Sequence, residues 1–296
     1  MNIRISNEAL SGSANNLLWS GALYGLKRLQ EFDHQLYFLV EDLTNQQQQL
    51  LENEKIASIK TSPDTVNLQI IAEDHNLKAL DNDGAEIESA PNWIALSNKI
   101  CFPTRKASQE RTTAETNISI SVNLDGTGQS DISTGLDFFD HMLEQIAKHG
   151  LIDLNISCDG DLEVDEHHTI EDVAITLGKT INDALGNKIG IQRYGFALPM
   201  DETLATVALD FSGRPYLKFN GDFKREMVGD FPTEMTEHFF YSLAINLQAT
   251  LHISIEGKND HHKIEGCFKG FARCLRAAVS RNERNLNVLP STKNLL

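Results

Sequence analysis

The pattern of apolar and polar residues divides the chain into two regions. In the first region, stretches with apolar residues at helical spacing alternate with short apolar runs that are typical of buried strands. We expect helices over residues 15–31 and 43–54 and strands over residues 35–40 and 67–72, with residues 92–100 closing the region. Helix alternating with strand predicts a small α/β layer built on a parallel sheet.

The polar stretch Thr104–Arg111 comes next, and its composition favours either a linker or the edge of a sheet. Beyond it the pattern becomes clearer and occurs twice. Glu115–Leu124 alternates as a strand and ends in a glycine turn, and Leu204–Leu209 does the same. Residues 138–149 and 236–247 both have the apolar spacing of a helix.

A constant spacing relates the two halves of this second region. A separation of 97 residues joins three matched pairs, which are His141 and His238, Leu154 and Leu251, and Gly160 and Gly257. Such a spacing indicates an internal duplication, with repeats at about residues 111–193 and 194–296. The predicted fold class is α+β: an internally duplicated unit of a sheet with two helices, in a domain of residues 109–296. A small α/β Rossmann-like region precedes it, over residues 1–108.

Composition and charge limit the possible partners and location. A length of 296 residues is consistent with about two domains. The formal net charge of −16 argues against a nucleic-acid partner. No apolar run reaches membrane-spanning length, and no secretory signal is visible, so we expect no membrane partner. The four cysteines lack zinc-type spacing and are expected to be reduced thiols in the cytoplasm.

The histidines concentrate in two matching pentapeptides of the form His-His-x-x-Glu. One spans His167–Glu171 and the other spans His261–Glu265. On a helix, the first histidine and the glutamate of each pentapeptide share a face, so they can bind the same ion. The second histidine points about 100° away. Each doublet can therefore serve two metals, or one metal and a substrate.

Together with a lone histidine in each repeat, these residues form a candidate metal-binding set: His141, His167, His168, Glu171, His238, His261, His262 and Glu265. Imidazole and carboxylate without thiolate suit Mn, Fe, Co, Ni or Zn more than Ca or Mg. The grouping into sites stays open, because each site could combine both repeats, and these could belong to different subunits. The competing interpretation is a structural or pH-sensitive histidine cluster. Asp140 and Asp172 flank the set, either as acceptors for imidazole N–H groups or as helix-surface acids.

A second set is suited to binding phosphate: Arg193, Arg214, Lys269, Ser291 and Lys293. Arginine in glycine- and proline-rich turns, together with a Ser-x-Lys tail, suggests a phosphate clamp in so acidic a chain. Ordinary solvated surface charge is the competing interpretation.

At these residues the chain resembles the imidazoleglycerol-phosphate dehydratase family, lyases of histidine biosynthesis, from Arg111 to Leu296. The motifs that carry the resemblance are Arg111–Thr116, Phe138–Leu143, Asp165–Asp172, Pro199–Glu202, Ser212–Pro215, Glu237–Phe240, Asn259–Glu265 and Pro290–Lys293. The resemblance implies two Mn²⁺ ions per active site, held by the eight groups above. It implies a duplicated fold of four-stranded sheets and a homo-oligomer of 24 subunits with active sites at subunit interfaces. One departure is Asn294, which stands where the family usually has glycine.

The reaction implied is metal-dependent dehydration of imidazoleglycerol phosphate, a small phosphorylated imidazole, to imidazole-acetol phosphate. The phosphate set above matches the family's phosphate site, and Glu115 matches an acid that contacts the substrate. Glu115, Glu171 and Glu265 are the candidates for moving the proton, and the sequence leaves the choice open. A dinuclear metallohydrolase of a phosphate ester would use the same metal-binding set. A non-catalytic protein that assembles through metal ions is a third possibility.

The first region is more faintly similar to a histidinol-phosphate phosphatase domain of the haloacid-dehalogenase type. The similarity rests on Gly21–Val40, Ile70–Asp74 and Asn92–Ile94. That chemistry needs an Asp-x-Asp at the end of the first strand, and Asn2–Asn7 lacks one. Asp81–Gly84 follows a helix-like stretch and is interpreted as a turn. We expect a degenerate, non-catalytic domain, with retained phosphatase activity as the alternative.

Overall fold

Two units make up the chain in the computed structural model, Met1–Pro103 and Thr104–Leu296. The structure describes residues 1–296 except 12–16, 60–62, 196–197, 282–286, 294 and 296, so Asn294 lies outside the described residues. The boundary between the units falls before residue 108, because Lys106–Thr112 forms a strand that pairs with the second unit's sheet. In the described part of the chain, no helix is both long enough and apolar enough to cross a membrane.

The first repeat of the Thr104–Leu296 unit is a four-stranded sheet with two helices. Its strands lie in the order β6-β7-β9-β8 and comprise β6 (Lys106–Thr112), β7 (Thr116–Asn123), β8 (Ser130–Ser133) and β9 (Asp153–Gly160). Neighbouring strands are antiparallel except β8 and β9, which are parallel. The stretch that was either a linker or an edge is therefore the edge strand β6. The helices are α5 (Asp137–Gly150) and α6 (His167–Leu185).

The second repeat has the same connectivity. Its sheet has the order β10-β12-β16-β13, with β11 also paired to β12; these strands are β10 (Tyr194–Gly195), β11 (Leu198–Met200), β12 (Thr203–Asp210), β13 (Tyr216–Asn220) and β16 (Thr250–Glu256). Again the last pair, β13 and β16, is parallel. The helices are α7 (Met235–Asn246) and α8 (Asp260–Val279), and the hairpin β14 (Met227–Val228) and β15 (Phe231–Pro232) precedes α7. The predicted duplicated α+β fold is confirmed.

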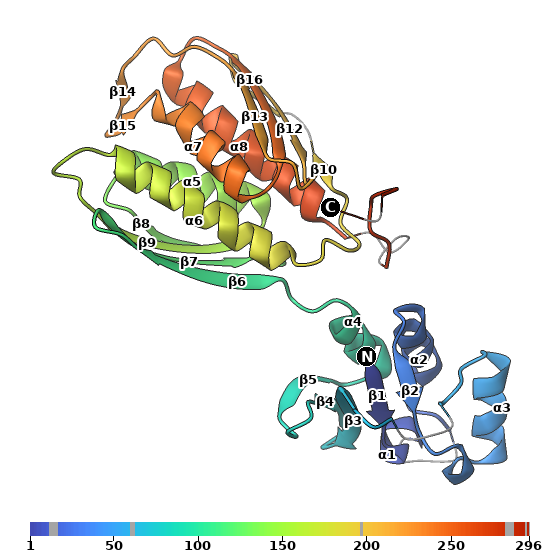
Figure 1. Cartoon of the computed structure of the whole chain (residues 1–296). Helices are drawn as coiled ribbons and strands as arrows, with labels where there is room; N and C mark the ends of the chain where they lie inside the picture. Colours follow the sequence, from blue (N-terminus) through green and yellow to red (C-terminus); the bar gives the residue numbers. More distant parts are fainter. Residues whose placement is uncertain (12–16, 60–62, 196–197, 282–286, 294, 296) are drawn as a thin grey trace. The chain divides into compact units, whose positions relative to one another are not determined.

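The four helices fill the space between the two sheets (Figure 1). They share one hydrophobic core, in which fully buried aromatic rings of α5, α7 and α8 pack edge to face or at a tilt: Phe139, Phe239, Phe240 and Phe268. Helix α5 packs on α8 and α6 packs on α7, so each pair joins the two repeats. His141 of α5 lies near Glu265 of α8, one turn into each helix. The helices of a pair thus begin at the same end, and the histidine doublets begin α6 and enter the first turn of α8.

The hairpin β14–β15 holds the start of α5 although it belongs to the other repeat. The backbone N–H groups of Asp137 and Phe138 donate to the carboxylate of Asp230, at 2.6 and 3.1 Å. Helix α5 has no side-chain cap at its own N-cap residue, Leu136. An acidic acceptor at a helix start satisfies otherwise unpaired N–H groups and interacts favourably with the helix dipole. Asp230 therefore fixes the turn that precedes His141.

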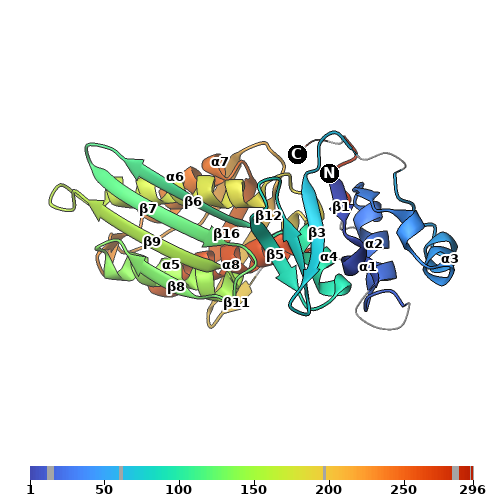
Figure 2. The ribbon, with the colours of Figure 1, turned by 90° about the horizontal axis from the view of Figure 1, so that it is seen from below.

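The Met1–Pro103 unit contains one five-stranded sheet of order β2-β1-β3-β4-β5 (Figure 2). The strands are β1 (Asn2–Ile5), β2 (Gln35–Tyr37), β3 (Leu68–Glu73), β4 (Asn76–Leu80) and β5 (Glu86–Ala90). The helical segments are α1 (Asn7–Ser11), α2 (Ala22–Glu31), the 3-10 turn η1 (Val40–Asp42), α3 (Asn45–Asn53) and α4 (Trp93–Cys101).

The expectation of a parallel sheet holds only for β2, β1 and β3, because β4 and β5 form an antiparallel hairpin on β3. The helix-like stretch before Asp81 is in fact strand β4. Asp81–Gly84 is the turn between β4 and β5, in which the Asp81 carboxylate accepts from the backbone N–H groups of Asp83 and Ala85.

Candidate functional site

One group of three side chains that could bind a metal ion combines both repeats. The first histidine of the first doublet, His167, lies with Nε2 3.3 Å from Oε2 of Glu171, as the i, i+4 spacing predicts. His238 of α7 places its own Nε2 3.4 Å from the same oxygen. One ligand atom from each residue lies within 4.8 Å of the others. Two imidazoles and a carboxylate at this separation can bind one divalent metal ion.

The environment of His238 supports that interpretation. Its Nε2 is buried and makes no well-formed hydrogen bond among the described residues, although it lies 3.4 Å from the Glu171 carboxylate. A buried polar atom that lacks a well-formed hydrogen bond costs about 1–3 kcal/mol. A metal ion bound between the three side chains would provide the missing interaction.

A second group mirrors the first across the repeats. Glu265 lies with Oε2 3.6 Å from Nε2 of His261 and with Oε1 4.0 Å from Nε2 of His141. Lys269, one helical turn further on, binds the same carboxylate at 2.8 Å. The lysine ammonium therefore occupies part of the position that a cation would take, and this group is looser than the first. The ring of His261 packs edge to face on Phe138.

The second histidine of each doublet lies outside both groups, as the helical geometry predicts. Nδ1 of His168 is 3.1 Å from both carboxylate oxygens of Asp161. Nδ1 of His262 is 2.9 Å from Oε2 of Glu202. The hydrogen bond that His168 donates to Asp161 raises the pKa of His168, and the hydrogen bond from His262 holds the pKa of Glu202 at about 2. Each imidazole is thus fixed through Nδ1, which leaves Nε2 available.

The sequence analysis did not identify Asp161 and Glu202 as partners of the histidines. For Asp140 and Asp172, the structure supports neither of the two roles considered. Asp140 accepts from the backbone and hydroxyl of Thr134, at 2.9 and 2.5 Å, and so ties the preceding turn to α5. Asp172 is buried and accepts from Arg111 and Thr116, each at 2.7 Å. Neither is a helix-surface acid, and neither has a described hydrogen bond to an imidazole.

Glu115 lies beside the first doublet. Its Oε1 is 3.6 Å from Nε2 of His168, and its side chain is 49% exposed. The main-chain carbonyl of Glu115 accepts from the N–H of Asp161 at 3.0 Å. This carboxylate is therefore near a nitrogen that could bind a metal ion, and it is exposed enough to contact a small molecule.

The five residues suited to phosphate do not form one cluster within the chain. The guanidinium of Arg193 binds both oxygens of Asp210, at 2.5 and 3.0 Å, and the carbonyl of Pro290 at 3.0 Å. Ser291 and Lys293 belong to the same tail segment as Pro290, where the N–H of Lys293 donates to the Ser291 hydroxyl.

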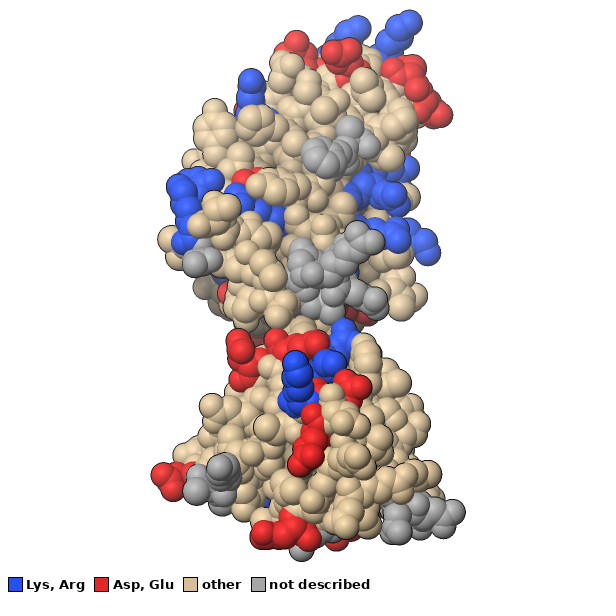
Figure 3. All heavy atoms as spheres, turned by 90° about the vertical axis from the view of Figure 1, so that its right-hand side faces the viewer, with Lys and Arg blue, Asp and Glu red and all other residues tan. Residues whose placement is uncertain are grey.

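Lys269 is tied to Glu265, and Arg214 is exposed and donates to the carbonyl of Ser212 at 3.2 Å. On the face of this unit in Figure 3, Lys and Arg side chains form separate groups rather than one patch.

The cysteines take no part in either group. None of the four forms a disulfide within the described residues, and Cys158, Cys267 and Cys274 are buried. Burial raises the pKa of the thiols of Cys158 and Cys274 to about 12. These side chains pack in the core, and the metal-binding set is made of imidazole and carboxylate alone.

Comparison with known proteins places this unit in a family. A family model described as imidazoleglycerol-phosphate dehydratase matches residues 134–275. The histidine biosynthesis bifunctional protein HisB of Campylobacter jejuni is 56% identical over 195 residues, which is 66% of this chain and 55% of that protein. The chain thus spans about half the length of this relative.

Two solved structures are similar to the chain. The imidazoleglycerol-phosphate dehydratase of Staphylococcus aureus subsp. aureus N315 is 40% identical with a TM-score of 0.55, covering 60% of this chain and 99% of that one. The enzyme of Pyrococcus furiosus in complex with (S)-C348 is 34% identical with a TM-score of 0.54, covering 64% of this chain and 100% of that one.

Proposed function

Because the chain belongs to the imidazoleglycerol-phosphate dehydratase family, we propose that it catalyses the metal-dependent dehydration of imidazoleglycerol phosphate to imidazole-acetol phosphate in histidine biosynthesis. The observation that carries this proposal is the crossed grouping of His167, Glu171 and His238, with a buried imidazole nitrogen that makes no well-formed hydrogen bond among the described residues. The mirrored group at Glu265 gives a second position for an ion. The proposed cofactor is Mn²⁺, two ions per active site.

A metal bound to the substrate's imidazole lowers the cost of removing a ring proton and so assists loss of the hydroxyl group. The chain's own residues then have to hold the ring and move protons. Three side chains in each group leave coordination positions open for other ligands. The imidazoles of His168 and His262 lie outside both groups and are held through Nδ1 by Asp161 and Glu202, so Nε2 of each can supply such a ligand. We propose that they complete the groups of another copy.

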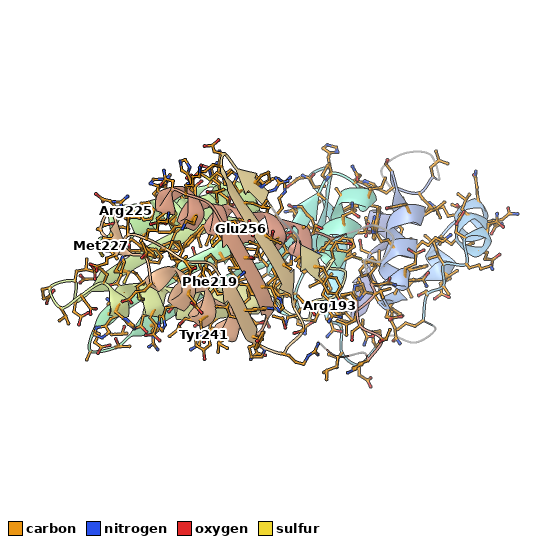
Figure 4. All side chains as sticks on the ribbon, turned by 90° about the horizontal axis from the view of Figure 1, so that it is seen from above. Arg193, Phe219, Arg225, Met227, Tyr241 and Glu256 are labelled. Atoms are coloured by element: carbon orange, nitrogen blue, oxygen red, sulfur yellow. The ribbon has the colours of Figure 1, made fainter. Side chains whose placement is uncertain are left out.

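The position of Arg193 also favours an active site shared between copies. The backbone N–H of Arg193 donates to the carbonyl of Ala278, near the end of α8. His261, in contrast, is at the start of that helix. From residue 261 to residue 278 the helix spans about 25 Å at a rise of about 1.5 Å per residue. One small substrate cannot reach both. In Figure 4, Arg193 lies at one end of the second sheet. Arg225 and Met227, which come from the segment before α7, lie at the other end.

If Arg193, Ser291 and Lys293 bind the phosphate, they do so beside the metal groups of another subunit. A large homo-oligomer with sites at its interfaces, such as a 24-subunit particle, meets this requirement.

Among the three glutamates, Glu115 is best placed to carry a proton. Glu171 faces two histidines, and Glu265 is only 11% exposed and is bound to Lys269. Glu115 has neither restriction and lies next to a nitrogen that would bind a metal. A carboxylate within reach of the substrate can remove a proton from carbon and return it to the leaving hydroxyl.

The test is to incubate the Mn²⁺-loaded full chain with imidazoleglycerol phosphate and follow the enol–keto product by its absorbance. We expect product with no release of phosphate. Phosphate release without dehydration would instead support a dinuclear metallohydrolase. Uptake of Mn²⁺ and assembly without any turnover would support a purely structural role of the ions.

We also propose that the Met1–Pro103 unit is a degenerate phosphatase domain without catalytic activity. Strand β1 is central between β2 and β3, and its carboxyl end is the place where the phosphatase nucleophile is needed. Asn7 and Glu8 stand there and line a cavity of about 460 Å³ together with Glu73, the last residue of β3, and Asp74 of the β3–β4 turn. Glu8 cannot replace an aspartate nucleophile in the same geometry. Incubation of the full chain with histidinol phosphate is therefore expected to release no phosphate; release at an enzymatic rate would contradict this proposal.

A further inference from the structure

The two carboxylates that contact the second histidine of each doublet have a role of their own. We propose that Asp161 and Glu202 are positioning residues, each of which holds one imidazole so that its Nε2 can bind a metal ion. The inference rests on the proposed function for the identity of the ion.

The geometry fixes which nitrogen is free. Asp161 and Glu202 approach Nδ1 of His168 and His262 at 3.1 and 2.9 Å. A carboxylate accepts hydrogen bonds, so Nδ1 carries the proton and Nε2 carries the lone pair. A partner of this kind on the distal nitrogen orients a metal-binding imidazole and raises its basicity.

Both carboxylates are themselves held in place. The turn that begins at Asp161 is closed by two backbone hydrogen bonds, from Asp161 to the carbonyl of Glu115 and from Val164 to the carbonyl of Asp161. Glu202 accepts from the N–H of Asn259 at 3.0 Å through its other oxygen. A hydrogen-bonded carboxylate of this kind keeps the imidazole in one orientation before an ion arrives, which lowers the entropy lost on binding.

The duplication explains why the two carboxylates come from different places. Glu115 and Glu202 occupy equivalent positions, each directly before the buried threonine that begins β7 or β12. In the first repeat Asp161 follows Gly160, whereas in the second repeat Lys258 follows Gly257. A lysine cannot accept the histidine N–H, so Glu202 takes that contact. In the first repeat Asp161 already provides it, which leaves Glu115 free for the substrate.

This division of roles makes a specific prediction about metal affinity. Asp161→Ala and Glu202→Ala should each weaken Mn²⁺ binding at one of the two positions, by about 10- to 100-fold. The double variant should weaken both. Asp161→Asn keeps an acceptor and should fall between the wild type and Asp161→Ala.

The experiment titrates Mn²⁺ into the metal-free full chain by calorimetry and by the electron paramagnetic resonance of the free ion. Asp159→Ala is the matched control for Asp161, because Asp159 is exposed on β9. Glu256→Ala is the control for Glu202, because Glu256 is exposed on β16. Thermal melting of the metal-free variants shows whether each one folds.

Weakening of different positions by the two variants, with unchanged controls and unchanged melting, supports the inference. Unchanged affinities overturn it, as does equal weakening by the controls. A variant that melts early and loses both positions together overturns it as well, because the carboxylate would then act on folding. The dehydration assay is separate: a wild type that binds two ions but forms no product overturns the proposed function and leaves this inference standing.

Discussion

The carboxylate of Glu171 lies 3.4 Å from Nε2 of His238, although the two residues belong to different repeats. The mirrored contact, between Glu265 and His141, spans 4.0 Å. Both contacts arise because α6 packs on α7 and α5 on α8, with the starts of the paired helices together. Neither repeat alone therefore contains a complete group. A substitution at one of these residues in either repeat should affect an ion position that also depends on the other repeat.

The first histidine of each doublet should be essential for both binding and turnover. We expect His167→Ala and His261→Ala each to lose one bound Mn²⁺ ion and at least about 100-fold in activity, because a ligand is removed and the substrate's ring is no longer held. Metal analysis of the purified variants and the dehydration assay provide the two measurements. Full metal content with wild-type turnover in either variant would show that the ligand assignment is wrong. His252→Ala is the control, since His252 lies on β16 away from both groups.

Removing the cap supplied by Asp230 should lower stability. Asp230→Ala leaves two N–H groups at the start of α5 without their acceptor, which costs about 0.5–2 kcal/mol. Asp230→Asn keeps one of the two acceptor oxygens and should cost less. Denaturant unfolding measures the difference. Equal stability of the alanine variant and the wild type would contradict the capping role.

Lowering the pH should remove the contribution that the ionised Asp153 carboxylate makes to the stability of the folded state. The backbone N–H of Thr127 holds the pKa of Asp153 below its ordinary value, with further lowering by Gln129 and Asn123. A lowered folded-state pKa stabilises the protein above the unfolded value of about 3.9, and this contribution is lost as pH falls through the folded pKa. Asp153→Asn should therefore lower the melting temperature at pH 7 and match the wild type in strong acid. A difference that stays constant over this pH range would be inconsistent with a charged acceptor, and Asp131→Asn, on the exposed strand β8, is the control.

The phosphate assignment is tested by the Michaelis constant. Lys293→Ala and Arg193→Lys should raise KM for imidazoleglycerol phosphate by about 10- to 100-fold, the value of one or two charge-assisted hydrogen bonds. Bound Mn²⁺ should be unchanged, and the effect should shrink in high salt. Lys218→Ala, on β13, is the control. A lowered metal content with unaltered KM would remove these residues from the phosphate site.

Much of the Thr104–Leu296 fold follows from the sequence, because α5, α6 and α8 are amphipathic and several matched positions of its repeats share a spacing of 97 residues. The local pairs His167–Glu171 and His261–Glu265 were predictable for the same reason, since a helix dictates them. The assignment of His238 to the first group and His141 to the second was not, because it depends on which helices pack together. Glu202 could have been found, since it occupies the same place as Glu115 in the duplicated pattern. Asp161 could not have been found in this way, because its contact with His168 joins a turn to a helix.

The Met1–Pro103 unit was less predictable for a related reason. The stretch that forms β4 has apolar residues that fit either a helix or a strand. Its pairing with β3 and β5 decides between them, and a pattern within one short segment contains no information about such partners.

Counting bound ions in paired variants tests the crossed arrangement most directly. Equilibrium titration with Mn²⁺ should give two ions per chain for the wild type and one for His167→Ala, for His238→Ala and for their double variant, because both residues belong to one group. The double variant of His167 and His261 should bind none. If instead the double variant of His167 and His238 loses both ions, each repeat holds its own ion and the crossed arrangement is wrong.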